Sequence, residues 1–303
     1  MSGTTLSGIA ALNPEIYTPI MRATYYSNNF PYEHWGVSTP PKGDYVYWRL
    51  ACDGTQSAEA TTESASAPTA NVASVIQMKI AKQSFQVQAQ ITHEAVDFAD
   101  TSMGDPWALA IKHATDDLKD TASTTMLTAL EAAIAATGTY GGQTRTSYTS
   151  ALVSGADATS EALSISDMST ALRTVTDADR AVPMDQLAWY MSPTLGMTYA
   201  KISNQNVDTI RSITRAQGAP VDGGYGYGFS GMNFNGVPIF LVPDMTSTTA
   251  LLGPRNDVKV WEAVPPRIKP LGDTDRSYKA LIDTTVNITV TQPALWYKLT
   301  NKT

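Results

Sequence analysis

The 303-residue sequence predicts an α+β protein in which sheets and shorter helices are laid along one long helix. Apolar residues recur at helical spacing throughout residues 106–136. Residues 75–92 and 286–290 alternate side chains as strands do. Residues 187–242 place a strand, a helix and another strand in succession, and this mixture is typical of the α+β class.

The long helix has a marked start and one apolar stripe. Ser102 and Asp105 can accept hydrogen bonds from its first N–H groups, and Pro106 suits the first helical position because no donor is needed there. At about 1.5 Å per residue, residues 106–136 form a rod of roughly 45 Å. The stripe expected to face a packing surface consists of Trp107, Ile111, Ala114, Leu118, Ala122, Met126, Leu130 and Ile134.

Composition excludes several classes of protein. With 43% hydrophobic and 16% charged residues, the chain can bury the core of one or two domains. A net charge of −7 and the lack of Lys/Arg runs argue against a dedicated nucleic-acid reader. A single cysteine, Cys52, excludes an intrachain disulfide and a multi-cysteine metal site. We find no signal peptide and no apolar run of about 18 residues, which predicts a soluble protein made in a cytoplasm, without a membrane partner.

The N-terminal residues 1–41 combine frequent prolines with aromatic side chains. Such prolines block long helices, and so many aromatics are wasteful in a solvated tail. We therefore expect an extended arm that packs against a neighbouring surface. The alternative is a covering layer on the chain's own domain.

A long β excursion is expected over residues 45–92. Residues 45–50 read as a strand, residues 53–71 are small and polar like a loop tip, and residues 75–92 read as a returning strand. The apolar parity changes at residues 81–84, which indicates a bulge or bend. Eighteen residues span about 60 Å, more than a globule with a radius of gyration near ~19 Å can enclose. Because isolated hairpins are marginal in water, we expect neighbouring subunits to stabilise this excursion.

The second half of the chain supplies a compact α+β part and further strands. Ser164 and Asp167 have capping-box spacing before an amphipathic helix. Ser192 and Pro193 open another helix after an apolar strand. The expected strands are residues 187–191, 237–242, 258–264, 280–282 and 286–290.

No catalytic constellation is complete. His93-Glu94 lacks the second histidine of a zinc helix, because position 97 is an aspartate. The glycines from Gly226 to Gly231 match a dinucleotide pattern, but no helix follows them. Ser230 fails the spacing of a nucleophile elbow. We predict no catalytic, cofactor-binding or metal site, and we keep an enzyme that uses the Gly226 segment as an alternative.

Four segments in this order resemble the HK97-fold major capsid proteins of tailed bacteriophages. They are residues 85–96, before the long helix; residues 189–194, a strand followed by a proline-started helix; residues 234–239, a Gly-x-Pro strand entry; and residues 286–294, a closing strand that ends at Pro-Ala. The resemblance covers nearly the whole chain. It implies an N-terminal arm (residues 1–44), an extended β-hairpin called the E-loop (45–92), a peripheral domain with a spine helix and sheet (93–150 and 251–303), and a compact axial domain (151–250).

The resemblance also implies function and partners. The chain would self-assemble into hexamers and pentamers of an icosahedral virion head that encloses double-stranded DNA, which it would contact nonspecifically. A portal protein, and possible separate scaffolding and decoration proteins, would be its other partners. The E-loop tip has no lysine, so we predict no covalent cross-link there, and the short arm leaves no room for a fused scaffold. The alternative of the same fold is an encapsulin-type nanocompartment shell.

Function would then reside in interfaces between subunits. We expect the E-loop tip to contact a neighbour through Asp53, Gln56, Glu59 and Glu63. We expect the arm to contact a neighbour through Tyr17, Tyr25, Tyr26 and Trp35. The side chains expected to pack the spine helix are Trp107, Ile111, Leu118, Met126 and Leu130.

Overall fold

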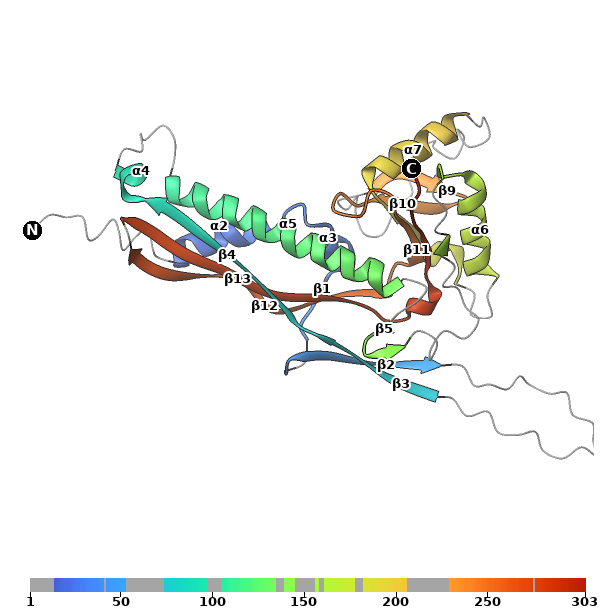
Figure 1. The fold of residues 1–303 in the computed structure, drawn as a ribbon, viewed down its shortest axis with the longest axis horizontal. Coiled ribbons are helices and arrows are strands. Elements are labelled where there is room, and N and C mark those ends of the chain that lie inside the picture. The colour runs from blue at the N-terminus through green and yellow to red at the C-terminus, as the bar shows by residue number, and fades with distance from the viewer. Residues whose placement is uncertain are drawn as a thin grey trace, which may run out of the picture.

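The computed structural model shows an elongated α+β chain with a smaller body at one end (Figure 1). It describes residues 14–40, 42–52, 74–97, 105–134, 139–144, 156–157, 161–177, 182–205, 229–274 and 276–303. The long helix α5 lies along a four-stranded sheet, a two-stranded ladder runs beneath, and a six-stranded sheet with helices forms the smaller body. The predicted α+β class is confirmed.

Helix α5 is the predicted long helix and extends over Pro106–Ile134. Asp105 caps it, because its Oδ1 accepts a hydrogen bond from the Trp107 N–H at 2.9 Å. All eight residues of the predicted stripe are buried. The last two residues expected in the helix lie outside the described part of the chain.

The four-stranded sheet lies under α5 in the order β1-β12-β13-β4. Its strands are β1 (Val37–Ser38), β12 (Val258–Thr274), β13 (Ser277–Val290) and β4 (Gln83–Thr92). Helix α5 contacts β4 and β13, and α2 (Pro14–Tyr26) contacts both β12 and α5, so the two helices share one face of the sheet. Strand β12 continues past the predicted end at residue 264 because its prolines lie along an open edge, where a missing N–H costs little.

The expectation of an extended arm is wrong for residues 14–35. They form α2 and the short helix α3 (Phe30–Trp35), which pack in the main core, as the alternative of a covering layer anticipated. Pro14 begins α2 and Pro31 lies in the first turn of α3. Prolines are tolerated at those positions. Pro19 lies inside α2, where it removes a helical hydrogen bond, and the packing of α2 in the main core outweighs that cost.

The two-stranded ladder joins β2 (Tyr45–Cys52) to β3 (Ser74–Ala81). The predicted change of parity is confirmed, since the chain bends at Lys82 and β4 leaves the ladder to pair with β13. The excursion is therefore shorter than expected. Residues 83–92 belong to the four-stranded sheet of their own chain, so their length no longer argues for contact with neighbouring subunits. The ladder's inner face also packs on its own chain, where Lys79 donates its N–H to the Gly141 carbonyl at 2.9 Å. Gly141 belongs to the turn between β5 (Thr139–Tyr140) and β6 (Gln143–Thr144).

The six-stranded sheet of the smaller body lies between two hydrophobic cores. Alternate residues of β8, such as Trp189 and Tyr190, point into different cores. One core is covered by α6 (Ile165–Thr176) and the other is continuous with the core beneath α5. The capping box of Ser164 and Asp167 is confirmed at the start of α6. In order, the strands are β7 (Ala156–Asp157), β14 (Tyr297–Leu299), β11 (Ala250–Pro254), β8 (Leu187–Met191), β10 (Val237–Leu241) and β9 (Phe229–Phe234).

Two of these strands come from residues that we expected in the peripheral domain. Strands β11 and β14 belong to the expected peripheral segment 251–303, except for Ala250, yet they pair beside β8. Strand order in a sheet depends on nonlocal pairing, which the apolar pattern of one strand does not report. The remaining elements are α4 (His93–Asp97), α7 (Pro193–Gln205), and the 3₁₀ turns η3 (Met184–Gln186) and η4 (Pro293–Leu295).

Candidate assembly surfaces

Two tyrosine hydroxyls attach α2 to the rest of the chain. Tyr17 donates to Asp105 Oδ2 at 2.7 Å, and Tyr26 donates to Glu262 Oε1 at 2.8 Å. Burial and the neighbouring carboxylate raise the pKa of each tyrosine above its usual range. Burial also raises the pKa of the Glu262 carboxyl. These hydroxyls thus serve contacts within the chain.

Tyr25 completes this attachment. Its side chain is fully buried, and its ring meets those of Tyr26 and Tyr32 edge to face, each pair with centroids 5.4 Å apart. The Tyr25 and Tyr32 hydroxyls are 3.2 Å apart. Arg22 Nε donates to the Pro266 carbonyl at 3.4 Å. Of the four predicted arm residues, Tyr17 and Tyr25 are therefore buried in their own chain, while Tyr26 and Trp35 are half-buried.

Helix α3 packs on the six-stranded sheet through aromatic rings. His34 Nε2 lies 3.0 Å from the Tyr190 hydroxyl, and the His34 ring lies 4.2 Å from that of Phe240. Trp35 packs against the Tyr190 ring at 5.5 Å. Burial, and next the positive charge of Arg255, lower the pKa of His34 to about 4. Apart from the aromatic content of residues 30–35, no local sequence pattern indicates this junction.

The C-terminal half of α5 also binds the smaller body. Ser123 Oγ donates to Asp244 Oδ2 at 2.7 Å, and Glu131 Oε1 accepts from the Thr246 N–H at 3.0 Å. Beside these contacts, Asp257 is buried and accepts from Trp296 Nε1 at 2.7 Å. Burial raises the pKa of Asp257 to about 6. Helix α5 therefore connects both bodies of the chain.

The outer face of the ladder exposes apolar side chains. Tyr45, Tyr47 and Val75 are 40%, 50% and 59% exposed, and Lys79 Nζ lies 5.4 Å from the centre of the Tyr45 ring. The strand register places these residues on one face, which we call the ladder face. Tyr45 and Tyr47 are neighbours on this face, whereas Arg49 and Gln77 lie between them and Val75. The predicted tip residues, Asp53, Gln56, Glu59 and Glu63, lie outside the described part of the chain.

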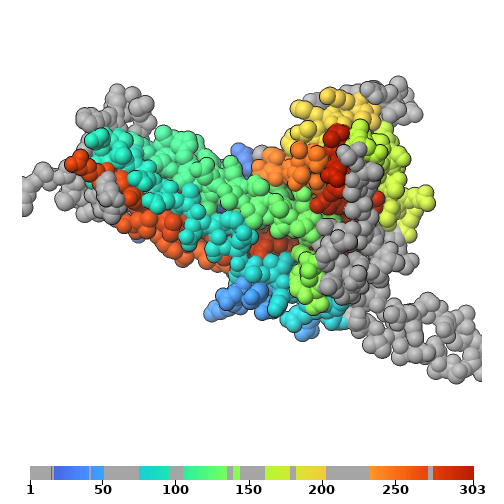
Figure 2. All heavy atoms as spheres, in the orientation of Figure 1, coloured from blue at the N-terminus to red at the C-terminus, as the bar shows by residue number. Residues whose placement is uncertain are grey.

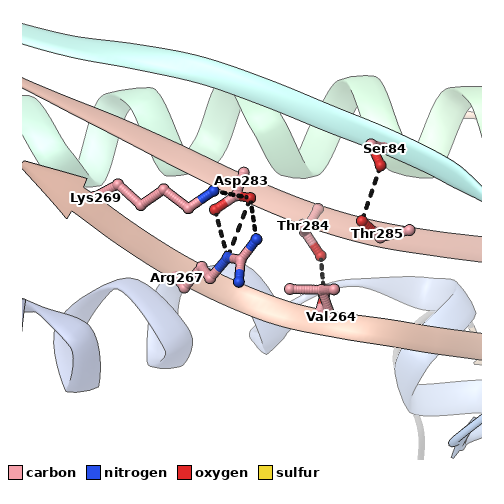
Figure 3. A network of polar contacts seen from close by, with 7 residues as sticks. All are labelled: Ser84, Val264, Arg267, Lys269, Asp283, Thr284 and Thr285. Atoms are coloured by element: carbon pink, nitrogen blue, oxygen red, sulfur yellow. Dashed lines mark hydrogen bonds and ion pairs between the residues drawn. The ribbon is translucent and has the colours of Figure 1, made fainter. Parts of the chain in front are cut away.

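The face of the four-stranded sheet opposite the helices is polar. Arg267 holds Asp283 through two nitrogens, with Nη2 2.8 Å from Oδ2, and Lys269 Nζ lies 2.9 Å from the same oxygen (Figure 3). These contacts, the Arg267 hydrogen bond first, lower the pKa of Asp283. Ser84 and Thr285 meet through their hydroxyls at 2.9 Å. Charged or hydroxyl side chains of β4, β13 and β12 thus meet on this face.

The five residues expected to pack the spine helix are each no more than 2% exposed; they are Trp107, Ile111, Leu118, Met126 and Leu130. Within the described ranges, no group of three His, Cys, Asp or Glu side chains could hold a metal ion. None of the helices described is both long and apolar enough to cross a membrane.

Comparison with known proteins identifies a matching family and several similar folds. A family described as phage capsid protein matches residues 76–299. The fold is similar to the capsid asymmetric unit of cyanophage A-1(L), with 14% identity, a TM-score of 0.63, and coverage of 88% of this chain and 89% of that one. It is similar to a Mycobacterium phage Che8 structure, with 12% identity, a TM-score of 0.57, and coverage of 96% and 89%.

An encapsulin is also among the similar folds. The holo-SrpI encapsulin complex of Synechococcus elongatus PCC 7942 shares 11% identity at a TM-score of 0.53, with coverage of 100% of this chain and 92% of that one. No curated protein sequence matches the chain. These likenesses confirm the predicted HK97-like capsid fold.

Proposed function

We propose, because the chain belongs to the phage capsid protein family, that its copies form the hexamers and pentamers of a head that encloses double-stranded DNA. As a member of this family, it is a self-assembling structural component of the virion's icosahedral head and not an enzyme. The finer arrangement into hexamers and pentamers, and the packaged DNA, are our proposal.

The observation that carries the proposal is the extent of the family match. Residues 76–299 begin in β3 and end in β14, so the match includes α5 and strands of both large sheets. The fold is shared with an encapsulin, but the family match favours the phage capsid over a nanocompartment shell.

For the contacts between subunits, we propose that the E-loop tip, residues 53–71, lies on an adjacent copy. The ladder face supports this proposal, because Tyr45 and Tyr47 leave apolar surface at the base of the same hairpin and Val75 leaves apolar surface at its tip end. We restrict the proposed arm contact to Tyr26 and Trp35, since Tyr17 and Tyr25 are buried in their own chain.

We propose the arm, E-loop, peripheral and axial division with revised boundaries. The E-loop then comprises residues 45–81, and β11 and β14 join the axial part, because those strands pair there. A portal protein and separate scaffolding or decoration proteins are the further partners we propose. Contact with DNA would be nonspecific and weak, given the net charge of −7.

Electron microscopy of the protein expressed alone tests the proposed function. We expect hexamer-sized rings or closed shells, and the ratio of absorbance at 260 and 280 nm reports nucleic acid in any shells. A monodisperse monomer would contradict the proposal. Nucleic-acid-free shells that carry one co-purified protein would favour the encapsulin instead.

Deletion of residues 58–67 tests the E-loop contact separately. We expect fewer and less stable particles, because the tip would no longer reach its neighbour. The circular dichroism of the variant should equal that of the wild type, which is the control for folding. Unchanged particle yield and stability would show that the tip has no such role.

A further inference from the structure

The two long edges of the four-stranded sheet differ in how they are protected against pairing with a further strand. Beyond its two pairs with β1, the outer edge of β12 carries Pro265, Pro266 and Pro270. Its register with β13 shifts at three places, and it bears the charged side chains of Arg267 and Lys269. Prolines, bulges and charges are the devices by which natural sheets prevent another strand from pairing at an edge.

The β4 edge has none of these devices. Its sequence QSFQVQAQIT contains no proline and no charged residue, and its register with β13 is unbroken over all 10 residues. Among the described strands, only β13 pairs with it. In the space-filling view, β4 forms part of a continuous uncovered band between α5 and the outer strands (Figure 2). A long regular edge without protection is a template for pairing with another chain.

The direction of the backbone groups on this edge follows from one hydrogen bond. His93 donates its N–H to the Arg276 carbonyl at 2.9 Å, one position beyond the Thr92–Ser277 pair. Because antiparallel partners alternate, odd-numbered residues of β4 bond to β13 and even-numbered residues direct their N–H and C=O groups outward. Ser84, Gln86, Gln88 and Gln90 therefore present unused pairing groups along the edge.

The pattern of side chains on β4 is the same read in either direction. Even-numbered positions 84 to 92 read hydroxyl, Gln, Gln, Gln, hydroxyl, and the odd-numbered positions 85 to 91 between them are all apolar. Suppose that a second β4 pairs antiparallel with the first, with Gln88 opposite Gln88. Polar residues would then face polar residues on one side of the sheet, and apolar residues would face apolar residues on the other side. The opposed pairs would be Ser84 with Thr92, Gln86 with Gln90, Gln88 with itself, Phe85 with Ile91, and Val87 with Ala89.

We propose that β4 pairs with β4 of a second copy about a two-fold axis at Gln88. The contact joins the two four-stranded sheets into one continuous sheet across the subunits. It is an isologous contact, in which the same patch serves both partners, and it brings no like charges together on β4. It deepens the proposed function, because it rests on copies of this chain meeting in a shell, and it adds a link that the E-loop and arm contacts do not provide.

Cysteine cross-linking in the full chain tests both the pairing and its register. On a Cys52→Ser background, we expect Gln88→Cys to give a covalent dimer under mild oxidation of assembled particles. Directly opposed residues have Cα atoms about 5.5 Å apart, within the range of a disulfide. The double variant Gln86→Cys/Gln90→Cys should also link, whereas Gln86→Cys alone should not, because each residue 86 lies about 13 Å along the strand from its symmetry mate.

The outcomes separate this inference from the proposed function. Particles in which Gln88→Cys forms no dimer overturn the pairing and leave the capsid assignment intact. A link that requires Tyr47→Cys together with Gln88→Cys also overturns it, since β2 of a neighbour would then occupy the edge. If no particles form, the proposed function fails, and the same cross-link measured on the soluble protein still decides the pairing.

A charge placed on the edge gives an independent test. We expect Gln88→Lys to reduce the yield of the proposed contact, because two ammonium groups would face each other across the axis. The matched control is Thr285→Lys, one strand inward on the same face, which pairs with Ser84 on β4 and faces the uncharged Val264 on β12. Three strand spacings alone put its symmetry mate more than about 14 Å away, beyond the ~8 Å Debye length at physiological salt. Equal assembly of both variants would contradict the proposal.

Discussion

Helix α5 and the N-terminal helices α2 and α3 pack on the rest of the chain through different kinds of contact. Helix α5 is held mainly by a stripe of apolar residues along its 29-residue length, with polar contacts from Ser123 and Glu131 only in its C-terminal half. Helices α2 and α3 instead use aromatic rings with polar tips, which bond to Asp105, Glu262 and Tyr190. A stripe needs only a hydrophobic surface, whereas each polar tip needs one particular partner. A charge in the apolar stripe of α5 should therefore prevent packing, whereas the contacts of α2 and α3 can be removed one hydrogen bond at a time.

A charge in the α5 stripe should have the largest effect. We expect Leu118→Asp or Ile111→Asp to prevent folding, because an unpaired buried carboxylate costs several kcal/mol, a large part of the stability of a domain. Far-ultraviolet circular dichroism and the yield of soluble protein measure the loss. The control is Lys112→Asp on the exposed side of the same helix, which should fold normally. Soluble, correctly assembling stripe variants would show that the buried face is misplaced.

The difference between these helices also explains which elements could be predicted. The α5 stripe, the capping box at Ser164 and strand β8 are local patterns, and each was located from its own residues. The partners of Tyr17 and Tyr26 lie 88 and 236 residues away, so no local pattern reports them. The prolines of residues 14–35 predicted an extended chain, but Pro14 and Pro31 lie at helix starts and Pro19 lies inside α2, so tertiary packing outweighs its local cost there.

The assembly surfaces also combine local patterns, which the sequence predicts, with nonlocal partners, which it does not. The alternation in residues 83–92 showed that one face is buried, but not that β13 is the partner on one edge and that the other edge is open. The polarity of residues 53–71 predicts a loop tip, while Tyr45 and Tyr47 before it predict a strand but not which face of that strand is exposed. Burial of Tyr25 and the junction at His34 depend on tertiary packing, which the aromatic content alone does not specify.

Acidification should loosen the N-terminal helices through His34. Its pKa is about 4 in the folded chain and near ~6.5 when unfolded. Between these values the unfolded chain binds a proton that the folded chain does not, so the free energy of unfolding falls as the pH falls through this window. The charged and hydroxyl groups that face His34 are Arg255 and Tyr190. Helix α5 has no such buried imidazole, since its only histidine, His113, is exposed.

The variant His34→Gln isolates this effect. We compare urea unfolding of wild type and variant at pH 7.5 and 4.5, and expect the drop in stability to be smaller in the variant by about 2.5 kcal/mol. Asp257 opposes His34, because its raised pKa of about 6 favours the folded state as the pH falls through 6. Since Asp257 titrates in both proteins, its contribution cancels in the comparison. Equal drops would mean that His34 is protonated in the folded chain.

The smallest effects are expected from the individual tyrosine hydroxyls of α2. Tyr26→Phe should cost about 2 kcal/mol, because a hydrogen bond to a half-buried carboxylate is lost and water replaces it poorly. Tyr17→Phe should cost less than about 1 kcal/mol, since the exposed Asp105 keeps its bond to the Trp107 N–H and gains water. Urea unfolding of the two variants at one pH measures both values against wild type. A Tyr17→Phe cost as large as that of Tyr26→Phe would show that burial of the acceptor does not determine the strength of these attachments, and α2 would then be held uniformly along its length, as α5 is.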